Sequence, residues 1–219
     1  MSRRWSRSLL VALVALVVSV LGAPVPGPSG ALWAAESPTL TAEERAQFRQ
    51  WLDESEQTLM ELIEGVEGEA WTWKPAPDRW SVAECTEHIV KSEAALFESA
   101  KAALAGEPDP EWETKTAGKV DFIARVMPDR SGRAQAPQEI RPAGGVTKDE
   151  LIAQFRAQRA ELEKLIGDQS LELKRYTQEH PFPVFGTLNA HQWLIYVPLH
   201  TIRHSKQIRE VKETAGFPG

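Results

Sequence analysis

The strongest constraint on the fold is a four-residue pattern that occurs three times and marks the first turn of a helix. Residues 41–44 (TAEE), 81–84 (SVAE) and 147–150 (TKDE) each place a hydroxyl three positions before a glutamate. In this capping box the hydroxyl and the carboxylate each bond a backbone N–H group that the first turn leaves free. The pattern therefore predicts three helices that begin at these residues.

Apolar side chains recur after each start at the spacing of one helix face, and the three runs end at Gly65, Gly106 and Gly167. A fourth helix is predicted from about residues 187–189 to about Lys212. The chain contains no internal repeat and no convincing strand. We therefore predict an all-α fold, a four-helix bundle in one domain over residues 41–213.

The connection between the second and third helices is unusually long. Residues 107–146 are rich in proline and glycine, which break long elements, although a short helix is expected around residues 120–127. Such a connection in a compact domain is usually functional or a crossover.

The first 35 residues are interpreted as a targeting segment rather than as part of the fold. Three arginines precede an apolar run at residues 9–21, and small residues follow it. This is the layout of a signal peptide, and the run is shorter than the roughly 20 residues that span a bilayer. We expect cleavage near Ala34 or Ala35 and export to the periplasm or the medium. The alternative is an uncleaved N-terminal anchor, the only feature that would tie the protein to a membrane.

Composition restricts the chemistry that the chain can perform. The formal net charge of −6 argues against binding to nucleic acid, which needs a dense basic face. The single cysteine, Cys85, can form neither an internal disulfide nor a cysteine-rich metal site. The five histidines, the carboxylates and the aromatic residues are left to supply a site.

Two histidines interrupt the apolar face of the fourth helix. His200 and His204 are one turn apart on the stripe that Trp193 and Val197 begin. Two buried imidazoles need partners for their nitrogens, and a shared metal ion would satisfy both. The pair is not the H-E-x-x-H motif of zinc peptidases, because Thr201 stands where that motif has glutamate.

His88 is the third candidate ligand, about two turns into the second helix. It can reach His200 and His204 only if the second and fourth helices are antiparallel. An up-down-down-up order achieves this and requires a long crossover between helices two and three. Residues 107–146 fit that crossover. The sequence thus predicts a divalent-metal site at His88, His200 and His204.

The chain resembles the DinB-like superfamily, in residues 79–84 (RWSVAE), in His88, and in residues 193–199 (WLIYVPL) and 200–208 (HTIRHSKQI). The resemblance covers roughly residues 41–213. It implies an up-down-down-up four-helix bundle whose three histidines hold a zinc- or nickel-like divalent ion. Characterised relatives include thiol-dependent transferases and isomerases, and others are regarded as hydrolases.

Several neighbouring residues have two interpretations each. We interpret Cys85 as a small core residue rather than a metal neighbour, and Glu84 as a helix cap rather than a partner of an imidazole. Arg203 is expected to form a surface ion pair, with an anionic substrate as the alternative. His180 and His191 are not expected to be ligands.

Other residues bear on the surroundings of the site. Pro198 is expected to kink the fourth helix. Trp71, Trp73 and Trp80 are expected to form a structural loop, with a roof over the pocket as the alternative.

The sequence favours an enzyme in which a divalent cation activates water or a thiol against a small-molecule substrate. Zinc and nickel are the favoured metals, although iron also accepts histidine ligands. The alternatives are a bundle with a structural or stored metal that binds a ligand or partner, and a bundle without metal. The sequence leaves the oligomeric state undecided, with a homodimer as one alternative.

Overall fold

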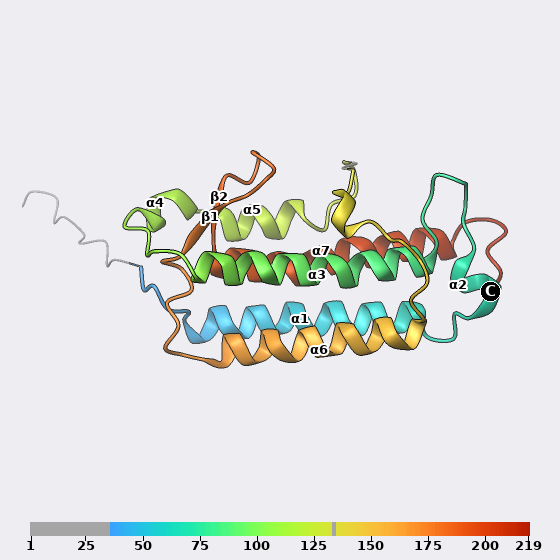
Figure 1. Ribbon diagram of the computed structural model, residues 1–219, viewed down its shortest axis with the longest axis horizontal. Helices are drawn as coiled ribbons and strands as arrows, with labels where there is room; N and C mark the ends of the chain where they lie inside the picture. The colour runs from blue at the N-terminus through green and yellow to red at the C-terminus, as the bar shows by residue number, and fades with distance from the viewer. Residues whose placement is uncertain (1–35, 133–134) are drawn as a thin grey trace, which may run out of the picture. The chain divides into compact units, whose positions relative to one another are not determined.

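The computed structural model describes residues 36–132 and 135–219. Four long helices dominate it (Figure 1): α1 (Ala42–Ile63), α3 (Val82–Leu104), α6 (Lys148–Gly167) and α7 (Ala190–Lys212). The fold is mostly helical, as predicted. The proposed signal segment, residues 1–35, lies outside the described residues.

All three predicted capping boxes are present. The side chains of Thr41, Ser81 and Thr147 each accept a hydrogen bond from the backbone N–H three residues later, and each glutamate bonds back to the backbone of the cap. A fourth box, Asn189 with Gln192, opens α7. The helices therefore begin where local hydrogen bonding dictates.

The long helices pack around two apolar clusters. α7 packs most extensively along α3 and then along α1, and α3 also packs against α6. One cluster includes Phe48, Leu162 and Trp193, and the other includes Ile89 and Phe155. Since each long helix contributes to both clusters from different parts of its length, the clusters occupy the two halves of the bundle.

A buried polar layer connects the four helices in the middle of their length. Arg159 of α6 forms two hydrogen bonds with the carboxylate of Glu93 of α3, at 3.0 and 2.5 Å. Glu93 also accepts from the hydroxyl of Thr201 on α7, and Arg159 donates to the carbonyl of Leu52 on α1 at 3.1 Å. The Glu93 side chain is 0% exposed and that of Arg159 is 6% exposed.

Shorter elements fill the connections: α2 (Gly68–Thr72), α4 (Trp112–Thr116), α5 (Lys119–Val126), the 3-10 helix η1 (Gln138–Ile140), β1 (Thr177–Glu179) and β2 (Thr187–Asn189). α5 lies where a short helix was expected. The expectation that the chain has no strand is wrong, because β1 and β2 pair antiparallel, Thr177 opposite Asn189. Three-residue strands are too short to produce an alternating pattern.

The crossover between α3 and α6 is attached to both helices of the predicted site. Glu87 of α3 accepts from the backbone N–H groups of Ala143 and Gly144, each at 2.9 Å. On the other side, Lys206 of α7 donates to the carbonyl of Pro128 at 3.0 Å. These bonds hold the crossover against α3 and α7.

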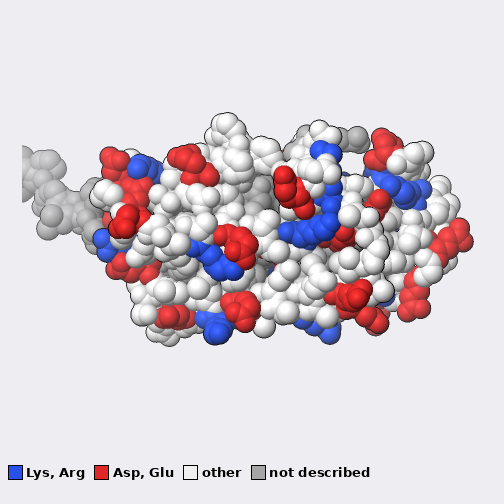
Figure 2. All heavy atoms as spheres, viewed as in Figure 1, with Lys and Arg blue, Asp and Glu red and all other residues white. Residues whose placement is uncertain are grey.

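On the face drawn in Figure 2, basic and acidic side chains are interspersed rather than gathered into a patch of one sign. No helix in the described part of the chain combines the length and apolarity that a bilayer-spanning helix requires.

Candidate metal centre

Three histidines from two helices meet inside the bundle. His88 of α3 and His200 and His204 of α7 each offer one nitrogen, and these atoms all lie within 4.8 Å of one another. The ring centroids are 4.4 Å apart for His88–His204 and for His200–His204, and 5.2 Å apart for His88–His200. The predicted convergence of the three imidazoles is confirmed.

A backbone carbonyl defines which nitrogen of His88 carries the proton. Nδ1 of His88 lies 2.8 Å from the carbonyl oxygen of Ile140, in η1 of the crossover. A carbonyl can only accept, so Nδ1 donates and Nε2 keeps its lone pair. Ser92 Oγ lies 3.4 Å from that Nε2. The crossover thus prepares His88 to act as a metal ligand through Nε2.

For His204, the proton-carrying nitrogen is identified by the side-chain amide of Gln207 together with the guanidinium of Arg130. Oε1 of Gln207 lies 2.9 Å from Nδ1 of His204 and accepts from Arg130 Nη1 at 3.1 Å. Because a guanidinium only donates, it identifies this amide atom as the oxygen, and Nδ1 of His204 must donate to it. Arg130 is itself held by Glu210 through bonds of 2.8 and 2.9 Å.

His200 has a different environment. Its Nδ1 is buried and has no hydrogen-bond partner in the described part of the protein. An unpaired buried polar atom is unfavourable by about 1–3 kcal/mol. Hydrogen bonds at Nδ1 leave the Nε2 lone pairs of His88 and His204 free, and His200 has an unsatisfied nitrogen. This set of nitrogen donors fits a divalent cation.

The three rings are neutral at neutral pH. Burial lowers the pKa of His88, His200 and His204. Repulsion between the rings adds to this effect for His200 and His204, because protonating one disfavours protonating its neighbours. Neutral imidazole is the form that binds metal.

An indole covers part of the cluster. Trp80 precedes the cap of α3, and its ring centroid lies 4.7 Å from that of His88 and 6.2 Å from that of His204. The two covered residues, His88 and His204, are only 2% and 8% exposed, whereas the residue His200 is partly exposed. Trp80 therefore lies over the site, while Trp73 packs on Phe217 near the C-terminus.

The remaining histidines and the cysteine lie outside the cluster, as expected. His180 stacks on Trp193 with centroids 4.8 Å apart, and His191 is buried at the start of α7. Cys85 is fully buried in an apolar cluster, which raises the pKa of its thiol. Glu84 completes the cap of α3 and pairs with Lys74 at 2.9 Å.

The expectation of a surface ion pair for Arg203 is wrong. Within the described residues, the guanidinium pairs with no carboxylate and donates instead to the carbonyl oxygens of Met127 at 3.4 Å and Gly132 at 2.6 Å. From the sequence alone, the crossover carbonyls that Arg203 meets could not be identified.

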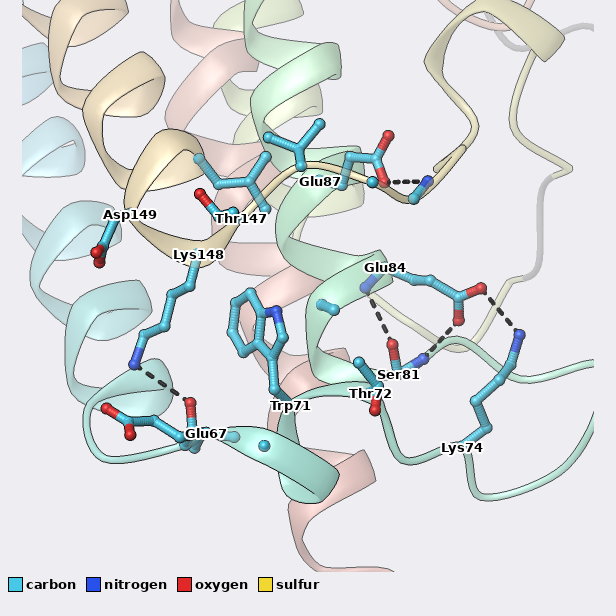
Figure 3. A pocket seen from close by; sticks show the side chains of 17 residues that line it. Glu67, Trp71, Thr72, Lys74, Ser81, Glu84, Glu87, Thr147, Lys148 and Asp149 are labelled. Carbon is cyan, nitrogen blue, oxygen red and sulfur yellow. Dashed lines mark hydrogen bonds and ion pairs between the residues drawn. The ribbon is translucent and has the colours of Figure 1, made fainter.

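A separate hollow lies away from the histidine cluster. A cavity of about 620 Å³ opens between α2 and the first turns of α3 and α6 (Figure 3). Trp71 lies in it, and Lys148 lies 5.7 Å over the indole while donating to the carbonyl of Val66. None of the three clustered histidines lines this cavity.

Comparison with known proteins identifies one matching family. A sequence profile of the DinB superfamily matches residues 51–208, a range that contains all three histidines. The chain is 26% identical over 152 residues to "Uncharacterized protein YuaE" of Bacillus subtilis (strain 168). The aligned region covers 69% of this chain and 88% of that protein. No solved structure matches the chain significantly.

Proposed function

The chain belongs to the DinB superfamily, and from that premise we propose that it is a metal-dependent enzyme in which His88, His200 and His204 bind one divalent cation. Zinc and nickel are the favoured ions, since both accept neutral imidazole. The observation that carries the proposal is the meeting of three neutral imidazoles, two of them in buried residues, whose nitrogens lie within 4.8 Å of one another.

The number of ligands favours a catalytic role over a structural one. Among the described residues, no fourth histidine, cysteine or carboxylate joins the cluster. Structural zinc sites use four protein ligands, whereas catalytic sites use three and keep one position open. When bound, such a cation lowers the pKa of water or a thiol and polarises a substrate. We propose a small-molecule substrate, attacked by water or by a thiol.

The residues around the histidine cluster define what the protein itself contributes to the proposed reaction. Trp80 and the burial of His88 and His204 exclude water from one side of the cluster. The hydrogen-bond partners of the rings in the described part of the chain are a carbonyl, an amide and a hydroxyl. Activation of the nucleophile is therefore assigned to coordination and not to a carboxylate base.

The proposal is tested by comparing metal-loaded and chelated wild-type protein in a screen of small esters, amides and electrophiles with added thiols. We expect turnover that disappears on chelation, returns with zinc or nickel, and is absent from His200→Ala. A melting temperature that depends on metal, without turnover of any substrate, would favour the structural alternative instead.

Gln207 is expected to act as a positioning residue for His204. Replacing it with alanine removes the acceptor for Nδ1, so zinc affinity should fall about 10–100-fold. Gln207→Glu keeps an acceptor and should retain most of the affinity, and the exposed Gln57→Ala serves as the control. Isothermal titration with zinc measures all three. Equal affinities for Gln207→Ala and wild type would contradict this role.

We also propose that the four long helices follow an up-down-down-up order. Lys212 at the end of α7 donates to the carbonyl of Leu62 at the end of α1, at 2.7 Å, which supports a parallel pair. Arg45 at the start of α1 donates to the carbonyl of Ile166 at the end of α6, which supports an antiparallel pair. His88 meets His204 from the start of α3 and the later part of α7, which supports antiparallel packing there.

Export is proposed from the first 35 residues of the sequence. The basic stretch and the apolar run at residues 9–21 support a signal peptide. Cell fractionation followed by N-terminal sequencing should find a shortened chain, beginning after Ala34 or Ala35, in the periplasm or the medium. Full-length protein in the membrane fraction would support the anchor, and full-length protein in the cytosol would contradict export.

A further inference from the structure

Arg203 is a partly exposed residue of α7 next to the histidine cluster in the sequence. It is three residues after His200 on α7, a spacing that makes the two side chains neighbours on the helix surface. His200 is the partly exposed residue of the three, whereas Trp80 lies on the rings of the other two. A small molecule that approaches the cluster from solvent therefore meets Arg203 beside His200.

The guanidinium of Arg203 carries a charge that no carboxylate of the described chain neutralises at contact. Its two bonds go to the carbonyl oxygens of Met127 and Gly132. Arg130 and Arg159 differ, since Arg130 is held by Glu210 and Arg159 by Glu93. Carbonyl oxygens orient a guanidinium without cancelling its charge.

The balance of charge at the site favours an anionic ligand. Three neutral imidazoles leave the charge of a bound divalent cation uncompensated, and Arg203 adds a further positive charge. The planar guanidinium matches a carboxylate, with which it forms short, charge-assisted hydrogen bonds.

We infer that Arg203 is a specificity-determining residue that selects small molecules bearing a carboxylate group. This inference rests on the proposed metal-dependent function, and it names the substrate class of the same site. A carboxylate held by Arg203 would bring the rest of the molecule to the open side of the cluster, next to His200.

The test uses zinc-loaded protein and two matched pairs of probes: acetate with acetamide, and benzoate with benzamide. Metal content is first measured for every sample by mass spectrometry. Isothermal titration then gives the affinity of each probe. We expect wild type to prefer the carboxylate of each pair, and Arg203→Gln to lose affinity for it about tenfold or more with its metal content unchanged. Arg203→Lys should retain part of the preference.

Arg209→Gln, an exposed change on the same helix, is the matched control and should bind like wild type. If metal-loaded wild type binds each amide as tightly as its carboxylate, or if Arg203→Gln and Arg209→Gln bind equally, the inference fails while the metal site stands. If wild type takes up no metal, the proposed function fails, and the inference fails with it.

Discussion

Replacing Arg159 with methionine is expected to lower the free energy of unfolding by about 3–5 kcal/mol. The change leaves Glu93, which is fully buried, without the guanidinium that bonds both of its oxygens. Burial already raises the pKa of Glu93 and Arg159 opposes that rise, so the isolated carboxyl becomes difficult to keep charged. Urea unfolding followed by circular dichroism measures the loss.

The exposed pair of Arg49 and Glu163 provides the matched control for this prediction. It joins α1 to α6, at 3.3 Å, and both side chains are more than 40% exposed. Arg49→Met should therefore change stability by less than about 1 kcal/mol. Combining Arg159→Met with Glu93→Met should be less damaging than either single change, since no unpaired charge is left. Equal effects of Arg159→Met and Arg49→Met would contradict a structural role for the buried layer.

Acid is expected to destabilise the protein through two histidines that are not in the metal site. Burial lowers the pKa of His180 and of His191 to about 4. Around His191, Glu44 opposes this shift, whereas Lys174 and Arg45 add to it. Below the ordinary pKa of 6.5 the unfolded chain takes up protons at these residues and the folded protein does not.

Stability contributed by the two rings is therefore fully present above pH 6.5 and is lost as the pH falls toward 4. Each histidine should account for about 1.4 kcal/mol per pH unit in that window. Urea unfolding of metal-free protein between pH 7 and pH 5 measures the slope. His180→Phe, which keeps the stack on Trp193, and His191→Met should each flatten it by about that amount. Unchanged slopes in both variants would contradict the shifted pKa values.

Local signals explain why the helices and the histidine cluster were predictable. A capping box at Ser81 or Thr147 is satisfied within four residues, so it does not depend on the rest of the fold. The prediction that His88 converges with the pair on α7 combined three features: helical spacing, the position of each histidine along its helix, and the length of the crossover. Each of these can be read without tertiary contacts.

Contacts between distant segments explain what could not be predicted. In sequence, Glu93 and Arg159 resemble ordinary charges on solvated helix faces, and only the packing of four helices buries them together. The partner of His88 is a backbone carbonyl 52 residues away, and backbone atoms leave no residue-type signal. Arg203 meets crossover carbonyls for the same reason. By contrast, His204 and Gln207 are three residues apart on one helix, so their contact could have been predicted from the sequence.

The most direct test of the metal centre is the zinc content of the purified protein after equilibrium dialysis. Wild type should retain one ion per chain, and His88→Ala and His204→Ala should retain none while keeping the helical circular dichroism of the wild type. His180→Phe, a change at a buried histidine outside the cluster, should retain the ion. Metal-free wild type, or His88→Ala that binds zinc as well as wild type, would contradict a site shared by α3 and α7.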